Sequence, residues 1–277
     1  MKILIGLVHN NDTMRNAAMQ ETVEVIRRSL SESDSCDVVS EYWQPKQLSM
    51  GFSERVKKFL ANTGAHFKIL SFVASGHLPT LIGNWLHASV VSLSSAFREV
   101  IEGLRKNLEP ARTLQLSIKH FLLWRQFIQS SSDYLLVLED DAIIFKDRIK
   151  DLSRLWSSLD ATHSAAEFIM VGAGYSFAEL GAEKAISETS EIGIQKATRP
   201  FANTASAYVI NRETAKFFAT SVSLQPRRLN VNADFLISLL LREVHDFDPT
   251  AGVRCLHFVP PIFDNASLFG RYQSSVS

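Results

Sequence analysis

Cysteine is scarce in this sequence of 277 residues, which contains only Cys36 and Cys255. Two cysteines do not make a disulfide framework, and no cysteine and histidine spacing resembles a zinc site, so the composition suits a reducing compartment. An excess of one charge is also missing, because Lys and Arg together number 29, as do Asp and Glu. The balanced charge gives no reason to expect nucleic acid or an acidic surface as a partner.

Long uninterrupted hydrophobic runs are missing as well. The longest apolar region, residues 67–93, is broken by His77, Pro79, Asn84 and His87, so we do not expect it to span a membrane. The opening MKILIGLVHNN has an apolar run too short for a signal peptide with its cleavage site. We therefore expect a cytoplasmic protein without a transmembrane segment, and peripheral contact with the inner face of the membrane stays an open alternative.

What the sequence does contain is a hydrophobic content of 46% and an alternation of strand and helix patterns. Short β-branched runs predict buried strands at residues 2–8, 36–43, 67–75, 134–139, 167–174, 205–210 and 253–258. Amphipathic segments predict helices at 12–30, 53–64, 96–107, 111–128, 148–159, 211–221 and 231–244. This order favours an α/β sheet with helices on both faces, where ligands bind at the carboxyl ends of strands.

The helix at 111–128 is apolar over much of its circumference, which predicts that it is buried. Its most regular apolar face consists of Leu114, Ile118, Phe121, Leu122 and Ile128. Leu116, Leu123 and Phe127 extend this face.

Three carboxylates, Glu139, Asp140 and Asp141, directly follow a strand in YLLVLEDDAIIF and are called the acidic triplet below. Clustered carboxylates repel one another, and holding them beside a buried strand costs free energy unless a cation or hydrogen-bond donors neutralise them. Mg²⁺ and Mn²⁺ accept oxygen ligands of this kind and also bind substrate phosphates. The alternative is a solvated turn in which an aspartate caps the next helix.

The segment around the acidic triplet resembles glycosyltransferase family 25, which includes lipopolysaccharide and collagen galactosyltransferases. That family has a Ser-His-x-x-x-Trp helix before a strand that ends in Glu-Asp-Asp, and SIKHFLLWRQFIQSSSDYLLVLEDDAI follows the same order through His120, Trp124 and Arg125. Lys119 stands where the family has serine. Weaker similarities continue in ASAYVINRETAKFF, NVNADFLISLLL and the Pro-Pro tail, whereas the first 110 residues share only HNNDTMR with the family.

The resemblance implies a GT-A-type, Rossmann-like mixed sheet with helices on both faces, built by residues 1–277 as a single domain. Residues 1–110 would be the nucleoside-binding half, and residues 111–277 the half for metal and acceptor. The implied reaction is inverting transfer of a hexose, galactose for example, from a nucleotide-sugar such as a UDP-hexose to lipopolysaccharide or another cell-surface glycan. Mn²⁺ or Mg²⁺ would bridge the donor diphosphate through the acidic triplet.

Within this interpretation, Asp141 and Glu139 are the predicted metal ligands. His257, on a late strand, is a candidate third ligand, and its alternative is a histidine packed in the core. Asp140 is predicted to contact the donor ribose or a water on the metal. His120 is predicted either to reach the donor phosphates or to hydrogen-bond an acid of the triplet, and its alternative is a core histidine that braces the strand.

Asp12 and Arg15 follow the first strand, where this fold usually binds the donor nucleoside, and helix capping is the alternative for Asp12. Asp234 opens a helix and is the candidate general base, because inversion needs a group that takes the proton of the acceptor hydroxyl. Its alternative is an aspartate that stabilises a helix N-terminus.

Two other functions compete with this one. A nucleotidyltransferase would also join an α/β sheet to acidic metal ligands, but it would normally have a Gly-rich, basic loop after the first strand, and VHNNDTMRNAA has no glycine. A degenerate transferase domain used only for binding is the other alternative, because the N-terminal motif is altered.

Overall fold

The computed structural model describes a large part of the chain, in several segments. They comprise residues 1–9, 13–30, 34–41, 112–159, 166–178, 180, 182–183, 186–188, 193–247 and 253–267. The helices predicted at 53–64 and 96–107, the strand predicted at 67–75, and Asp12 lie outside these residues. The described part of the chain contains no helix long and apolar enough to cross a bilayer.

The centre of the fold is a mixed sheet of eight strands in the order β2-β1-β3-β8-β5-β9-β7-β6. The strands are β1 (Lys2–Val8), β2 (Ser35–Glu41), β3 (Tyr134–Glu139), β5 (Ala166–Met170), β6 (Ile186–Glu188), β7 (Ile194–Ala197), β8 (Ala207–Asn211) and β9 (Val253–Phe258). β1 runs parallel to both β2 and β3, whereas β8 is antiparallel to β3 and β5. The predicted mixed α/β sheet is confirmed.

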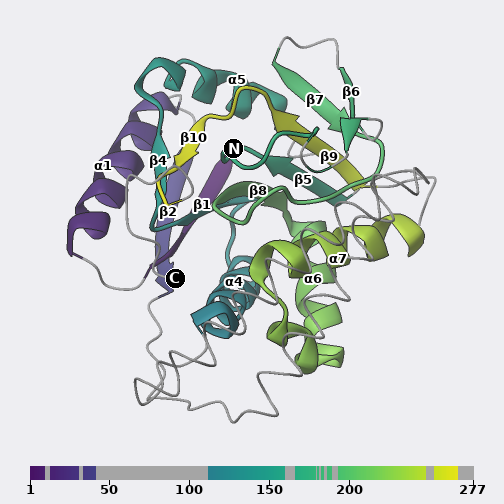
Figure 1. Ribbon diagram of the computed structural model, residues 1–277. Helices are drawn as coiled ribbons and strands as arrows, with labels where there is room; N and C mark the ends of the chain where they lie inside the picture. The colour runs from purple at the N-terminus through teal and green to yellow at the C-terminus, as the bar shows by residue number, and fades with distance from the viewer. Residues whose placement is uncertain are drawn as a thin grey trace, which may run out of the picture.

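Helices cover both faces of this sheet (Figure 1). One face carries α1 (Thr13–Ser29) and α5 (Asp151–Ser158), and the other carries α4 (Arg112–Gln129), α6 (Arg212–Leu224) and α7 (Ala233–Phe247). Two short 3₁₀ helices, η1 (Lys146–Arg148) and η3 (Pro226–Asn230), connect these elements. The layered arrangement that the alternating sequence pattern predicts is therefore present.

Alternation along β3 decides to which face of the sheet Glu139, the first residue of the acidic triplet, points. Leu135 and Val137 pack in the core beneath α4, α6 and α7, whereas Tyr134, Leu136 and Leu138 pack beneath α1 and α5. Because successive strand residues point to opposite faces, Glu139 follows Val137 to the α4 side of the sheet.

The buried side of α4 agrees only in part with the predicted apolar face. Fully buried side chains come from Leu123, Trp124 and Phe127, whereas Ile118, Phe121 and Leu122 are only partly covered. Polar Ser117, Lys119 and His120 are buried on the same helix. The predicted burial of α4 is therefore confirmed, with Leu123 and Phe127 from the extension of the predicted face fully buried and its buried polar residues not predicted from this pattern.

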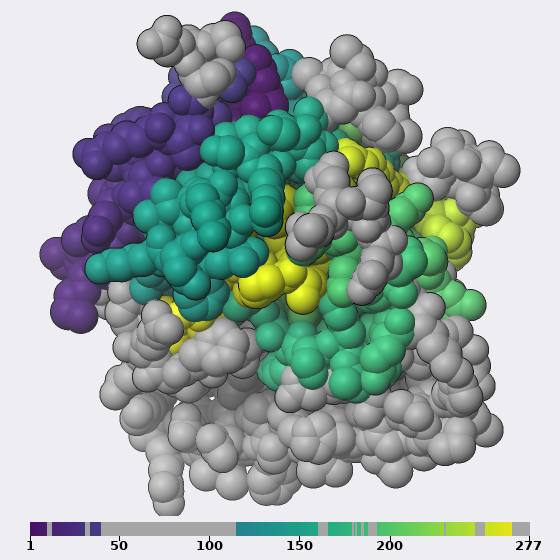
Figure 2. All heavy atoms as spheres, turned by 90° about the horizontal axis from the view of Figure 1, so that it is seen from above, coloured from purple at the N-terminus to yellow at the C-terminus, as the bar shows by residue number. Residues whose placement is uncertain are grey.

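Several short elements were not predicted from the sequence. They are β6 and β7 in the indistinct region 175–199, the helix η3, and the antiparallel ribbon of β4 (Ala142–Ile144) with β10 (Phe263–Asn265). The ribbon adds to the core on the α1 side through Ala142 and Phe263. Seen from above, the yellow C-terminal residues lie between the teal region around α5 and the green region (Figure 2).

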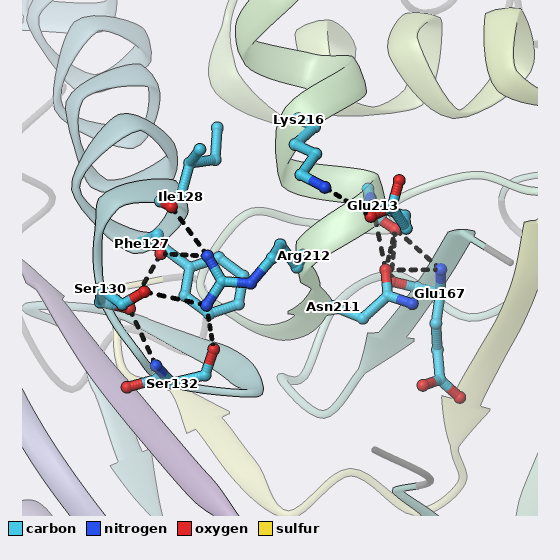
Figure 3. Close-up of polar contacts among 10 residues, drawn as sticks. Phe127, Ile128, Ser130, Ser132, Glu167, Asn211, Arg212, Glu213 and Lys216 are labelled. Carbon is cyan, nitrogen blue, oxygen red and sulfur yellow. Dashed lines mark hydrogen bonds and ion pairs between the residues drawn. The ribbon is translucent and has the colours of Figure 1, made fainter. Parts of the chain in front are cut away.

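Arg212, the first residue of α6, ties the end of α4 to the start of β3 (Figure 3). Its guanidinium group donates to the carbonyl oxygens of Ile128 at 2.8 Å, Ser130 at 3.0 Å and Ser132 at 2.5 Å. It also lies over the ring of Phe127, 5.2 Å from the centroid. Helix C-termini leave carbonyl groups without intrahelical partners. The side chain of Arg212 therefore supplies donors to carbonyl groups at the end of α4 and in its connection to β3.

We expect Arg212→Met to lower the free energy of unfolding by about 2–4 kcal/mol, because several partly buried carbonyl groups lose a charged donor. Chemical denaturation measures this loss. Lys216→Met is the matched control, since Lys216 forms an exposed pair with Glu213, its one ion pair among the described residues. This substitution is expected to leave the stability unchanged. Equal stability of the Arg212 variant and the wild type would contradict this role.

Candidate active site at the carboxyl ends of β1 and β3

The acidic triplet lies where β1 and β3 end side by side. Val8 and Glu139 are paired in the parallel register of these strands, so His9 and Asp140 leave the sheet at neighbouring points. β1 lies between β2 and β3 in the sheet, so the chain passes from β1 to one side to form β2 and later to the other side to form β3. Such a reversal of strand order is a switch point, where open α/β sheets bind ligands. The region around the acidic triplet at this switch point is called the crevice below, by analogy with those sheets.

Asp140 is paired with Arg15 of α1. The guanidinium Nη1 lies 2.8 Å from Oδ1 of Asp140, and both side chains are only 8% exposed. An ion pair with so little solvent contact is held tightly. Two of the residues that were predicted to lie at the donor, Arg15 and Asp140, are therefore in contact with each other.

Glu139 is held from the α4 side. His120 Nε2 lies 3.1 Å from Oε1 of Glu139, and the other ring nitrogen of His120 lies 2.9 Å from the hydroxyl of Tyr208. Trp124 Nε1 donates to the same hydroxyl at 3.0 Å. The structure thus shows the predicted hydrogen bond between His120 and an acid of the triplet. Contact of His120 with the phosphates of a nucleotide-sugar stays a prediction.

Asp141 lies at the start of the β4–β10 ribbon. Its backbone carbonyl accepts from the amide of Ala266 at 2.9 Å, and its carboxyl group accepts a hydrogen bond from Ser267. Oδ1 of Asp141 is buried and has no hydrogen-bond partner among the described residues. Buried carboxylate oxygens are normally satisfied, so this oxygen calls for a partner that the described residues do not supply.

Lys119 brings a second buried cation to this end of the sheet. Its ammonium group donates to the carbonyl oxygen of His9 at 2.7 Å, and the side chain is only 2% exposed. Its charge lowers the pKa of Glu139, against the larger effects of burial and the neighbouring carboxylates. The sequence assigned Lys119 no role, although its place in the family's serine position was the available signal.

Asp234 approaches the site from the first turn of α7. Its carboxyl group accepts backbone hydrogen bonds at this helix N-terminus, from Phe235 among others. Ser117 of α4 donates to the carbonyl of Val231 at 2.6 Å, which ties α4 to the start of α7. Burial raises the pKa of Asp234, and these backbone hydrogen bonds and the charge of His120 oppose the rise.

A comparison with known protein families identifies the family of the segment that carries most of this site. Residues 116–237 match the family model described as glycosyltransferase family 25 (LPS biosynthesis protein). This segment belongs to glycosyltransferase family 25. The resemblance inferred from the sequence is thereby confirmed, and the enzyme class is a glycosyltransferase. No curated protein matches the chain significantly.

The matched segment contains most of the site but not all of it. It includes His120, the acidic triplet and Asp234, whereas Arg15 and His9 precede it and Ser267 follows it. In this glycosyltransferase the crevice is therefore completed by elements that the family model does not match. The pairing of β1 with β3 and of β4 with β10 brings them there.

Two acids of the triplet in the glycosyltransferase, Glu139 and Asp141, have raised pKa values in the protein alone. Burial raises the pKa of Glu139 to about 8, and the charges of Asp140 and Asp234 add to this rise. Burial also raises the pKa of Asp141 to about 7, with a further contribution from Glu139. Both shifts have the same cause, which is negative charge crowded where little water reaches it.

The charges of this crevice fit a divalent cation. The acidic triplet and Asp234 supply four carboxyl groups, which face two cations, Arg15 and Lys119. When all are ionised, the excess is two negative charges, which one Mg²⁺ or Mn²⁺ balances. The described residues contain no group of three or more Asp, Glu, His or Cys side chains that forms a ready metal cage. Mg²⁺ often needs only one or two carboxylates, with water and phosphate oxygens as its other ligands, so the two carboxylates of Glu139 and Asp141 are not too few to fit such an ion.

His257 does not join this site. It lies on β9, which is separated from β3 by β8 and β5, a distance of about 14 Å at the usual strand spacing. The centroid of its ring lies 4.8 Å from the centroid of the Phe201 ring and 5.4 Å from the centroid of the Phe177 ring. Burial lowers the pKa of His257 to about 3. The structure thus places it as the packed core histidine that was its alternative.

The predicted site residues fall into three groups. Those brought together at the crevice are Glu139, Asp140, Asp141, Arg15, His120 and Asp234. His257 lies elsewhere, and Asp12 is outside the described residues. Residues that the sequence did not single out are Lys119, Tyr208 and Ser267.

Proposed function

We propose that this glycosyltransferase moves a hexose from a UDP-hexose to a lipopolysaccharide or other cell-surface glycan, with inversion and with Mn²⁺ or Mg²⁺ in the crevice. The observation that carries the metal proposal is Oδ1 of Asp141, buried beside Glu139 without a hydrogen-bond partner among the described residues. The family description, an LPS biosynthesis protein, supports the glycan acceptor. We further propose that the protein acts at the cytoplasmic side of the membrane.

In this proposal Glu139 and Asp141 hold the cation, which when bound neutralises the charge that develops on the leaving diphosphate. Arg15 and Asp140 together present an oriented guanidinium and carboxylate to the nucleotide. Lys119 adds a buried positive charge behind the same strand end. These cations attract a diphosphate to a crevice that its own carboxylates would otherwise make repulsive.

Asp234 is the proposed general base. Inversion requires attack on the face of the sugar opposite the diphosphate, and a carboxylate there accepts the proton of the acceptor hydroxyl. The raised pKa of Asp234 makes it a stronger base than a solvated aspartate. Its position at a helix N-terminus, with backbone donors, fixes the direction of the carboxyl group.

A thermal-shift panel of UDP-, GDP- and CMP-sugars and of nucleoside triphosphates, each with and without Mn²⁺, tests the proposal. We expect a UDP-sugar to stabilise the protein beyond the effect of Mn²⁺ alone, and only when the metal is present, because the diphosphate binds through the cation. A response to nucleoside triphosphates alone would indicate a nucleotidyltransferase. Absence of any nucleotide response would indicate a binding domain and would overturn the proposal.

The raised pKa values predict an unusual pH dependence of stability without metal. The folded protein keeps protons on Glu139 and Asp141 up to about pH 7–8, whereas the unfolded chain loses them near pH 4, so rising pH favours the unfolded chain. The stability from these two groups is present below about pH 4 and is lost by about pH 8. We expect the melting temperature of the metal-free protein to fall over this window.

Melting curves between pH 5 and 8, with and without Mn²⁺, measure this effect. Stabilisation by Mn²⁺ is expected to grow with pH, because the ligands must lose their protons to bind. Asp141→Asn removes one of the two groups and should weaken the pH dependence of the metal-free protein. A steeper fall in this variant than in the wild type would contradict the assignment.

A further inference from the structure

A series of hydrogen bonds leads from the core to the acidic triplet. Trp124 Nε1 lies 3.0 Å from the hydroxyl of Tyr208, which lies 2.9 Å from Nδ1 of His120, and Nε2 of His120 lies 3.1 Å from Oε1 of Glu139. Trp124, Tyr208 and His120 are all fully buried. These four residues come from α4, β8 and β3, so the series joins three elements at the crevice.

The chemistry of the groups fixes the direction of this series. An indole nitrogen only donates, so the oxygen of Tyr208 accepts from Trp124. The hydroxyl proton of Tyr208 then has one acceptor among the described residues, Nδ1 of His120. A neutral imidazole that accepts at one nitrogen carries its proton on the other. His120 therefore donates from Nε2 to Glu139.

Ring packing keeps the series in place. The rings of His120 and Tyr208 are stacked, with centroids 5.7 Å apart and planes inclined by 22°. Trp124 packs edge-on against Phe218, with centroids 5.0 Å apart. Burial also lowers the pKa of His120 to about 3, which agrees with a neutral ring. The rings have little freedom to turn, so the hydrogen-bond directions persist.

We infer that Tyr208 and Trp124 are positioning residues that lock His120 as the Nε2–H tautomer, so that it engages Oε1 of Glu139 and leaves Oε2 as the oxygen for a cation. The part that concerns the cation rests on the proposed function. Outer partners of this kind orient carboxylate ligands, and their loss commonly weakens metal binding 10- to 100-fold. The tautomer itself follows from the hydrogen bonds alone.

Nitrogen NMR of the ¹⁵N-histidine-labelled, metal-free full chain tests the tautomer. His120→Gln assigns the signals by removing one set. For His120 we expect an unprotonated Nδ1 and a protonated Nε2, with no averaging between them. Protonation at Nδ1, or averaging of the two nitrogens, would overturn the inference.

Tyr208→Phe tests what fixes the tautomer. The variant removes the hydroxyl that donates to Nδ1, so the nitrogen signals of His120 are expected to move towards an average of both tautomers. Trp124→Phe keeps a ring but removes the N–H, and it should produce a smaller change of the same kind. An unchanged His120 spectrum in folded Tyr208→Phe would overturn the inference.

Tyr134→Phe is the matched control. Tyr134 is equally buried in the sheet, and its hydroxyl donates to Glu167 at 2.6 Å, on β5 rather than at the crevice. We expect this variant to lose comparable stability while the His120 spectrum stays unchanged. A His120 spectrum that changes equally in both variants would mean a general loosening of the core and would contradict the positioning role.

Equilibrium binding of Mn²⁺ tests the second half of the inference without any turnover. We expect Tyr208→Phe to weaken Mn²⁺ binding about 10- to 100-fold, whereas Tyr134→Phe leaves it unchanged. Equal Mn²⁺ affinity in Tyr208→Phe and wild type would overturn the positioning of Glu139. Failure of the wild type to bind Mn²⁺ would overturn the proposed metal site, and the tautomer would still be decided by NMR.

Discussion

Asp141→Asn is expected to lower kcat by at least about 10³-fold and to abolish the stabilisation by Mn²⁺ and nucleotide together. A bound cation contributes several kcal/mol to charge stabilisation in the transition state, and each 1.4 kcal/mol is a factor of ten in rate. Asparagine keeps the shape of the side chain but loses the negative charge that the cation needs. Steady-state kinetics and Mn²⁺ titration measure the two effects.

The matched control for this change is Asp147→Asn. Asp147 is an exposed acid in η1, six positions further along the chain, and it is expected to leave both activity and Mn²⁺ binding unchanged. Wild-type turnover in the Asp141 variant would refute a metal at this crevice. A fall in activity with unchanged Mn²⁺ affinity would assign Asp141 another role.

Asp234→Asn is expected to lower kcat by about 10²–10⁴-fold, because a positioned general base contributes about this much. Binding of Mn²⁺ and UDP should stay within a few-fold of wild type, since the proposed cation ligands are Glu139 and Asp141. At saturating Mn²⁺, where Glu139 and Asp141 are already ionised, the ascending limb of the pH–rate profile should also disappear, because the base that must lose a proton is gone. Pre-steady-state and steady-state kinetics together separate these effects.

Asp246→Asn is a control on the same helix. Asp246 lies exposed near the end of α7, far from the N-terminal turn that holds Asp234. We expect its substitution to leave kcat and the pH–rate profile as they are. If Asp234→Asn retains wild-type kcat, the base must be another group, and the carboxyl group of Asp234 only stabilises the helix.

The main features of the fold could be predicted from the sequence because they rest on local patterns. β1, β3 and β8 are continuous buried runs, and α1 shows its buried residues Met19, Val23 and Ile26 at helical spacing. Short elements such as β4 and β10 escaped prediction, because three residues carry too little periodicity. They matter here, since their pairing puts Ser267 beside Asp141.

The candidate site was predicted in part for the same reason. The acidic triplet and His120 lie within one recognisable stretch, and their contact follows from a helix that packs beside the strand it precedes. His257 was predicted to join them only by analogy. The strand order, which one sequence does not reveal, places β8 and β5 between β3 and the strand β9 that carries His257. The role of Lys119 was hidden because a lysine in an apolar helix is usually exposed, whereas this one reaches a carbonyl at the end of β1.

The most direct test of the account is calorimetric titration of UDP into the wild-type chain, first without metal and then with saturating Mn²⁺. If a cation held by Glu139 and Asp141 joins the protein to the diphosphate, UDP will bind measurably only with Mn²⁺, and Asp141→Asn will lose that binding while Asp147→Asn keeps it. UDP binding of equal strength without any metal, or in Asp141→Asn with Mn²⁺, would contradict the account.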